Sequence, residues 1–87
     1  MLISDKYWFK DNEILTLDLH NMTYWFAKAY VESILKTVDE TIKEIVIIHG
    51  HSHGNALQKM VRNDIHSKKV KHIFLSLNPG ITSFILI

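Results

Sequence analysis

The pattern of apolar and polar positions divides most of the chain into alternating strands and helices. Residues 14–19 form a short β-prone run, and residues 45–48 form a continuous β-branched run, which is typical of a strand covered on both faces. Between these runs, apolar residues recur every three or four positions from about residue 23 to about residue 39. This spacing predicts a long amphipathic helix, and the hydroxyl of Thr23 is placed to cap it.

The second half of the chain predicts a shorter helix and two further strands. Asn55 is expected to cap the helix, which has four apolar residues facing inward: Leu57, Met60, Val61 and Ile65. Residues 70–75 and 81–87 predict strands, joined by a turn at Asn78-Pro79-Gly80. The last strand, which ends the sequence, could be an exposed edge that pairs between chains, so the oligomeric state stays open.

The order β-α-β-α-β-β predicts an α/β domain with a mixed four-stranded sheet. Strands joined through a helix are expected to pair in parallel, and the last two strands, joined by a tight turn, in antiparallel. Residues 14–87 form this domain, and residues 1–13 are interpreted as an N-terminal arm with an aromatic insert, Tyr7-Trp8-Phe9. That insert either covers the edge of the core or stacks on nucleic-acid bases.

Composition fits one small globular domain and excludes several other classes of protein. The chain has 87 residues, of which 47% are hydrophobic and 22% charged, so it is not an intrinsically disordered chain. It has no cysteine, which excludes a disulfide scaffold and thiolate metal sites. No secretory signal is visible, and the longest apolar runs are far shorter than the roughly 20 residues that cross a bilayer. We therefore expect a cytoplasmic protein without a membrane partner.

Charge is distributed unevenly along the chain. Residues 1–44 carry five lysines and eight acidic residues, a net charge of −3, whereas residues 45–87 carry a net charge of +4. The basic residues of the second half are Lys59, Arg62, Lys68, Lys69 and Lys71. They form either a solvated surface or a set of phosphate contacts to nucleic acid.

Asp18 and His20 are the first candidate site residues. Residues two apart on a strand point to the same face, and both lie where the first strand gives way to the long helix. Ligands of open α/β sheets collect beyond the carboxyl ends of strands. Such a pair could orient the imidazole, share a metal or act as acid and base. Alternatively, Asp18 caps the loop and His20 fills a gap.

The second candidate is the segment that follows the second predicted strand, His49-Gly50-His51-Ser52-His53-Gly54-Asn55. Its glycines would let backbone amides approach an anionic ligand at the start of the next helix. The alternate histidines His49, His51 and His53 could also bind zinc, which would make the protein a metal-binding hydrolase. The sequence contains no P-loop motif, so a P-loop nucleotide site is not supported.

Taken in order, these residues resemble the small MutS-related (Smr) domain family. Leu17-Asp18-Leu19-His20 matches the LDxH motif of the family, and Met22-Thr23 continues its usual LDLHGMT run. Ile47-Ile48-His49-Gly50 matches the strand that enters its HGxGxG motif, and Gly80-x-Thr82-x-Phe84 resembles its closing strand. The similarity covers about residues 14–87.

The resemblance implies a two-layer α/β sandwich similar to the C-terminal domain of translation initiation factor three. It also implies binding to DNA or RNA and, in several members, nicking or endonuclease activity. Asp18 and His20 would take the LDxH role, with His49 as a further catalytic group and Asp18 as a ligand of Mg²⁺ or Mn²⁺. The other candidates would contact nucleic acid: Gly50, His51, His53, Gly54, Asn55, Lys59, Arg62, Lys68, Lys69 and Lys71.

Two departures from the family pattern keep a non-catalytic alternative open. Asn21 stands where the family usually has glycine, although asparagine tolerates left-handed backbone geometry. The loop reads HGHSHGN instead of HGKGxG, so a lysine and a glycine are lost. A domain that kept the fold but lost catalysis would still bind nucleic acid or a protein.

Overall fold

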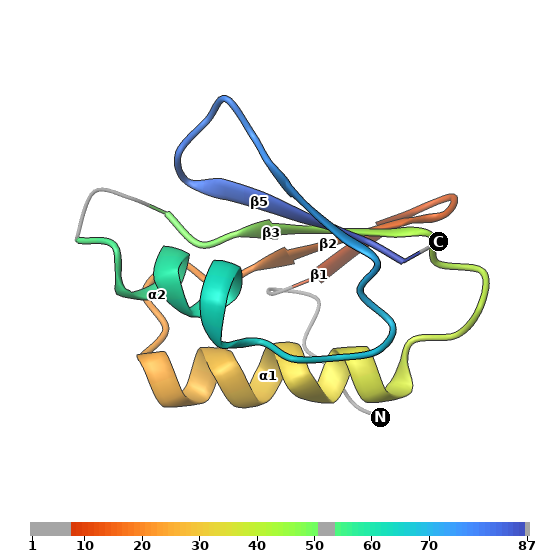
Figure 1. Ribbon diagram of the computed structural model, residues 1–87, viewed down its shortest axis with the longest axis horizontal. Coiled ribbons are helices and arrows are strands. Elements are labelled where there is room, and N and C mark those ends of the chain that lie inside the picture. Colours follow the sequence, from red (N-terminus) through yellow and green to blue (C-terminus); the bar gives the residue numbers. More distant parts are fainter. Residues whose placement is uncertain (1–7, 51–53, 87) are drawn as a thin grey trace.

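The computed structural model describes residues 8–50 and 54–86, and it has one layer of helices on one face of a twisted sheet (Figure 1). The elements follow one another as β1 (Trp8–Asp11), β2 (Ile14–Asp18), α1 (Tyr24–Thr37), β3 (Glu44–Ile48), α2 (Ala56–Lys59), η1 (Met60–Asp64), β4 (His72–Leu75) and β5 (Ile81–Ile85). The fold class predicted from the sequence, α/β with a mixed sheet, is confirmed.

The sheet has the strand order β1-β2-β3-β5-β4. Strands β2 and β3 are parallel, with Leu17 opposite Ile47. They run in the same direction because α1 returns the chain to the end of the sheet at which β2 begins. Strands β4 and β5 are antiparallel, as the turn at residues 78–80 predicts. In that turn Asn78 accepts a hydrogen bond from the Gly80 amide on its side chain, at 2.8 Å.

The sheet has five strands rather than the predicted four, because residues 8–11 form β1 instead of part of an arm. β1 pairs antiparallel with β2 through a two-residue turn at Asn12 and Glu13. Asn12 adopts a left-handed φ of 56° there, which asparagine tolerates better than most residues. The turn lacks a glycine or proline, so the sequence pattern did not reveal it.

The last strand is not an edge of the sheet, contrary to the expectation from the sequence. β5 lies between β3 and β4 and pairs antiparallel with both. Thr82, Ser83 and Phe84 are consequently buried. The edge strands are β1 and β4.

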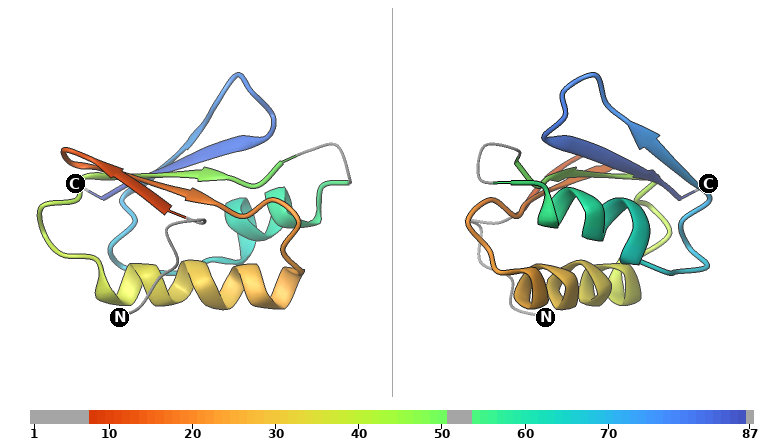
Figure 2. Two further views of the ribbon diagram at one scale, coloured as in Figure 1. Left: turned by 180° about the vertical axis from the view of Figure 1, so that it is seen from behind. Right: turned by 60° about the vertical axis from the view of Figure 1, so that its left-hand side comes forward.

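The core lies between the sheet and the helices, all on one face. In Figure 2 both helices are seen to cover the same side of the strands. The buried apolar residues are Leu15, Leu17, Leu19, Ala27, Val31, Ile34, Leu35, Ile42, Ile45, Ile47, Met60, Val61, Ile65 and Phe84. None of the described helices covers the other face, so the molecule has two layers and an open sheet surface.

The helix α1 begins and ends as its sequence predicts. Thr23 caps it by accepting a hydrogen bond from the Phe26 amide on its hydroxyl, at 3.3 Å. Its inward residues, including Val31 and Ile34, are buried against the sheet. No helix in the described part of the chain is long and apolar enough to span a membrane.

The second helical segment differs from the prediction at both ends. The side chain of Asn55 makes no capping hydrogen bond to α2. After one turn the α-helix changes into the π-helical turn η1, which places Met60 and Val61 in the core. Arg62 follows them on the same turn and reaches toward β5.

Candidate functional site

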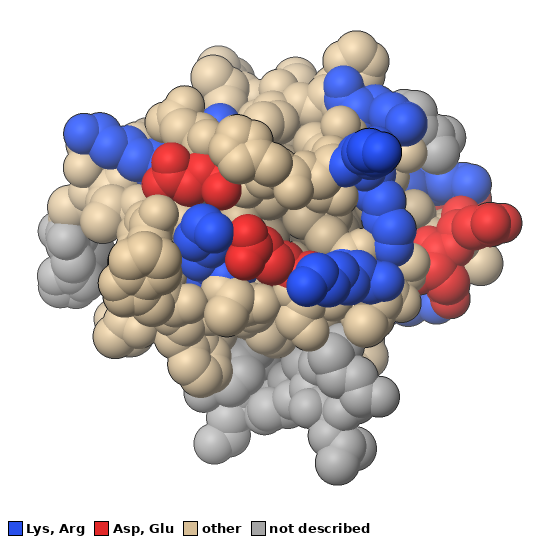
Figure 3. Space-filling view, turned by 60° about the horizontal axis from the view of Figure 1, so that its bottom comes forward, with Lys and Arg blue, Asp and Glu red and all other residues tan. Residues whose placement is uncertain are grey.

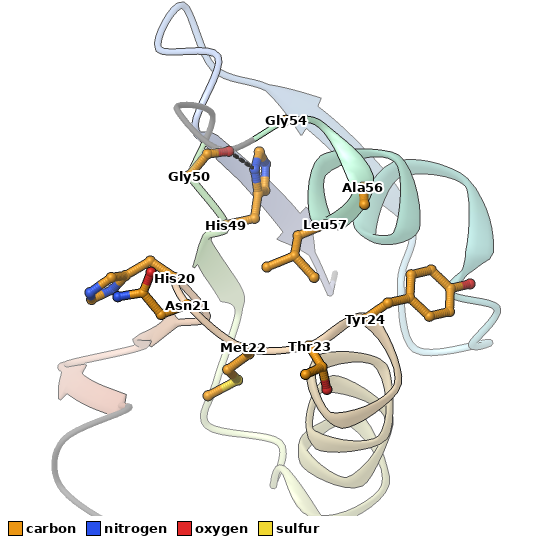
Figure 4. Close-up of a pocket in the computed structure, with 10 residues that line it drawn as sticks. All are labelled: His20, Asn21, Met22, Thr23, Tyr24, His49, Gly50, Gly54, Ala56 and Leu57. Carbon is orange, nitrogen blue, oxygen red and sulfur yellow. Dashed lines mark hydrogen bonds between the residues drawn. The ribbon is translucent and has the colours of Figure 1, made fainter.

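A pocket of about 410 Å³ opens at the carboxyl ends of β2 and β3, where both helices begin (Figure 4). It is lined by His20, Asn21, Met22, Thr23, Tyr24, His49, Gly50, Gly54, Ala56 and Leu57. The two motifs singled out in the sequence therefore converge on one cavity, because β2 and β3 are parallel neighbours.

Asp18 and His20 form a hydrogen-bonded pair at the rim of this pocket. Asp18 Oδ1 lies 2.5 Å from His20 Nδ1 and also accepts a hydrogen bond from the His20 amide, at 3.1 Å. The carboxylate therefore fixes the orientation of the ring and favours a proton on Nδ1. The His20 side chain is 61% exposed. Among the described residues, none bonds to its second nitrogen, Nε2, which is left as a potential proton acceptor.

Asn21 makes the turn that takes the chain from this pair into α1. Its φ is 67°, the left-handed conformation that glycine adopts most easily. The Met22 amide donates to the Leu19 carbonyl across the turn, at 3.0 Å. Asparagine therefore supports the geometry that the family usually achieves with glycine.

His49 lies at the base of the pocket and is only 4% exposed. Its Nε2 is 2.8 Å from the hydroxyl of Thr82, which also accepts a hydrogen bond from Arg62 Nε at 2.9 Å. Its Nδ1 lies 3.0 Å from the Gly50 carbonyl, which can only accept, so Nδ1 carries a proton. The Thr82 hydroxyl then donates to Nε2, and the three side chains form one satisfied chain of hydrogen bonds.

The backbone amides of His49 and Gly50 are both used in hydrogen bonds within the protein. The amides of His49 and Gly50 both donate to the Gly80 carbonyl, at 2.9 and 3.1 Å. A Cβ on Gly80 would lie 3.4 Å from the Gly50 Cα, so the two glycines allow the loop and the turn to pack closely. The amide of Gly50 is thus used inside the protein and does not point at a ligand.

The structure describes only Gly54 and Asn55 among the remaining residues of this loop. Gly54 has a φ of 101° and is exposed at the side of the pocket, and Asn55 follows it at the start of α2. His51 and His53 lie outside the described residues. No cluster of three or more His, Cys, Asp or Glu side chains suited to a metal is present in the two described stretches, 8–50 and 54–86.

Tyr24 forms one wall of the pocket and connects the two helices. Its hydroxyl donates to Asp64 Oδ2 at 2.7 Å, joining the first turn of α1 to η1. The hydrogen bond to Asp64 is the main cause that raises the pKa of Tyr24 above its ordinary value of 10.0. Sequence reasoning did not find this contact, nor the role of Thr82. The Gly80-x-Thr82-x-Phe84 pattern pointed to the position of Thr82 without indicating a partner.

The basic residues predicted to contact nucleic acid do not all lie near this pocket. Lys59 and Arg62 line a groove beside β4, close to α2. Lys68, Lys69 and Lys71 lie at the opposite end of the molecule, where the Lys71 amide bonds to the end of β5 at the Ile85 carbonyl.

The distant lysines form a lysine cluster with two further residues. Together with Lys36 and Lys43 they line two adjoining grooves, and Figure 3 shows lysine side chains gathered along that side of the helical face. Lys69 also has a structural contact, since its Nζ lies 3.3 Å from the carbonyls of Lys36 and Val38 at the end of α1. A cation at this position stabilises the negative end of a helix dipole.

Comparisons with known proteins agree with this arrangement of motifs. The sequence profile described as "Smr domain" matches residues 17–79, which is more than half of the chain. Among solved structures, the chain is similar to the crystal structure of the Smr domain of Thermus thermophilus MutS2. The TM-score is 0.73 at 20% sequence identity, over 83% of this chain and 96% of that one. No curated protein sequence matches. The likeness of structure shows the fold, and the profile match shows that the chain belongs to the Smr domain family.

Proposed function

We propose that this protein binds nucleic acid and nicks it by phosphodiester hydrolysis at the pocket between β2, β3 and α1. The observation that carries the proposal is the Asp18–His20 pair, which lies at the rim of a cavity formed by both family motifs. A carboxylate that holds one imidazole nitrogen leaves the other to accept a proton, which is the arrangement a general base requires.

In the proposed reaction, a phosphate of the substrate enters the pocket beside the first turn of α1. That turn contains no acidic residue, so the positive end of the helix dipole favours an anion there. Nε2 of His20 takes the proton from an attacking water as the new P–O bond forms. The bond to the leaving oxygen of the sugar breaks, and that oxygen takes up a proton from water.

His49 enters the proposal as a positioning residue. Its buried ring is hydrogen-bonded to Thr82 and to the Gly50 carbonyl. A proton transfer at His49 would therefore break hydrogen bonds that hold the floor of the pocket together. Arg62 supports the same contacts through Thr82 and is half-buried. The same bonds argue against a zinc site on His49, because a metal would have to displace one of them.

The lysine cluster would supply affinity that is independent of sequence. Cations that contact phosphates release counterions, so the affinity falls steeply as salt rises. The molecule extends 33 Å along its longest axis, about one turn of a duplex. A substrate that reaches from the pocket to Lys68 and Lys71 would therefore run along the length of the protein.

A bound Mg²⁺ or Mn²⁺ would supply a Lewis acid to the phosphate. Asp18 offers one carboxylate, and its Oδ1 already accepts two hydrogen bonds from His20. Magnesium is often held by one or two carboxylates together with substrate phosphates. Reactions with and without a chelator test whether nicking requires the metal.

The test compares wild type with Asp18→Asn and His20→Ala on supercoiled plasmid and on a structured RNA, with Mg²⁺, with Mn²⁺ and with chelator. We expect nicking by wild type and a loss of about 100-fold or more in both variants, the typical contribution of a general base. Phe74→Ala, an exposed position on β4 that does not line the pocket, serves as the control that should keep full activity. Nicking that survives both substitutions would contradict the proposed site.

The second candidate function is a binding domain without catalysis, and the bonded amide of Gly50 favours it. A phosphate-binding loop needs free backbone amides, whereas this amide is held by Gly80. Under this alternative, wild type shifts plasmid and RNA on a native gel but cleaves neither. Asp18→Asn and His20→Ala would then bind as wild type does.

A further inference from the structure

Trp25 is an unusually exposed aromatic residue next to the pocket. It lies in the first turn of α1, directly after the pocket residue Tyr24, and it is 75% exposed. Tryptophan is on average highly buried in folded proteins. This large apolar surface beside a candidate phosphate site is therefore available for a ligand to stack on.

The orientation of Trp25 is constrained by its neighbour. The ring centroids of Tyr24 and Trp25 are 4.7 Å apart, with their planes at 86°, an edge-to-face contact. Tyr24 is itself held by its hydrogen bond to Asp64 on η1. The indole therefore packs against a fixed ring, while most of its surface stays open to solvent.

The surroundings of Trp25 favour a ligand that is both aromatic and anionic. The helix start capped by Thr23 has no acidic residue in its first turn, so it attracts a negative group. His20 and Thr23 line the same pocket as Tyr24. A nucleotide offers both parts at once, a flat base for the indole and a phosphate for the helix start.

We propose that Trp25 stacks on an unpaired base adjacent to the phosphate in the pocket, so that the substrate is single-stranded or locally unpaired nucleic acid. The inference rests on the proposed function, since it names the substrate class of the same site. In an intact duplex both faces of each base are covered by neighbouring bases. A single strand can turn one base onto an aromatic side chain, whatever the base is.

The test uses fluorescence of the indole itself. The chain has two tryptophans, so Trp8→Phe leaves Trp25 as the single reporter. The probes are oligo-dT and oligo-rU of about 12 nucleotides, within the usual size of single-strand sites, and a duplex of the same length. We expect both oligonucleotides to quench Trp25 fluorescence, and the duplex to leave it unchanged.

A second measurement compares affinities. We expect Trp25→Ala to weaken oligonucleotide binding about 5- to 150-fold, the range that corresponds to one stacked base, with little change for the duplex. Trp25→Phe should recover much of the loss, because phenylalanine still stacks. Phe74→Ala is the matched control: Phe74 is 62% exposed, lies on β4 opposite Ser83, and should have no effect.

The outcomes separate this inference from the proposed function. Equal affinity for duplex and single strand, unchanged in Trp25→Ala, would overturn the stacking role and leave the nucleic-acid function intact. Absence of binding to every probe by wild type would overturn the proposed function itself. Because Trp25 is largely exposed, the Trp25→Ala protein should fold, and a thermal melt by circular dichroism confirms it.

Discussion

At the scale of single residues, the site depends on hydrogen bonds between positions far apart in sequence. Thr82 accepts from Arg62, 20 residues away, and bonds to His49, 33 residues away. Tyr24 reaches Asp64 over 40 residues. Motif spacing identifies residues such as His49 and Asp18, but it does not say which partners hold them. For that reason the sequence predicted a catalytic His49, whereas the positioning role that we propose takes the burial and the bonds of its ring into account.

The contact between Tyr24 and Asp64 should make stability depend on alkaline pH. The pKa of Tyr24 is raised in the folded state, chiefly by its hydrogen bond to Asp64. The folded protein therefore holds this proton more tightly than the unfolded chain. The resulting stability is fully present below pH 10 and is lost as pH rises through the raised pKa.

Tyr24→Phe tests this dependence. We expect the variant to be less stable than wild type at neutral pH, with a difference that shrinks above about pH 10. Urea denaturation of both proteins between about pH 9 and pH 11 gives the comparison, in which the titration of other groups cancels. A difference that stays constant over this range would contradict the assignment.

At the scale of elements, the amphipathic pattern and the caps predicted α1, β2, β3 and the final hairpin. These elements have long periodic patterns or strong turn residues, such as the Asn78-Pro79-Gly80 turn. β1 was missed because its turn contains only Asn12 and Glu13. The π-helical turn η1 was missed because its apolar spacing resembles that of an ordinary helix. Its backbone hydrogen bonds reach one residue further along the chain than those of an α-helix, and apolar spacing alone does not reveal that difference.

The cap of α1 offers a prediction at this scale. Thr23→Ala removes the hydroxyl that accepts from the Phe26 amide, and we expect it to lower the free energy of unfolding by about 1 kcal/mol. Thr23→Ser keeps the hydroxyl and should remain close to wild type. Urea denaturation measures both. An alanine variant as stable as wild type would show that the helix start is stabilised by other contacts.

At the scale of the whole molecule, one thin core between sheet and helices carries the stability. Phe84 is fully buried in β5, and Phe84→Ala should cost about 3–5 kcal/mol, a large part of the stability of a small domain. Phe74→Ala on the open sheet face should change stability by about 0.5 kcal/mol or less. Denaturant unfolding distinguishes the two. Similar losses for both would mean that the open face is covered in solution.

The arrangement of charge is also a property of the whole molecule. The sequence predicted either a solvated surface or phosphate contacts for the five basic residues of its second half, and the fold divides them into two groups. Lys59 and Arg62 lie near α2, and Lys68 and Lys71 lie at the far end of the sheet. Which lysines share a face depends on the path of the chain after η1, and no local pattern encodes that path.

The uncovered face of the sheet has a consequence for how this domain can be elaborated. Phe9 and Phe74, at the two edges of this face, are exposed, and they are joined in register through Thr16, Val46 and Ser83, of which Ser83 is buried. An extra helix laid on this surface, or a strand added beside β1 or β4, would leave the walls of the pocket intact. Such additions would gain buried apolar area without disturbing the Asp18–His20 pair. The domain is thus suited to acquire new attachments over evolution while its pocket stays in place.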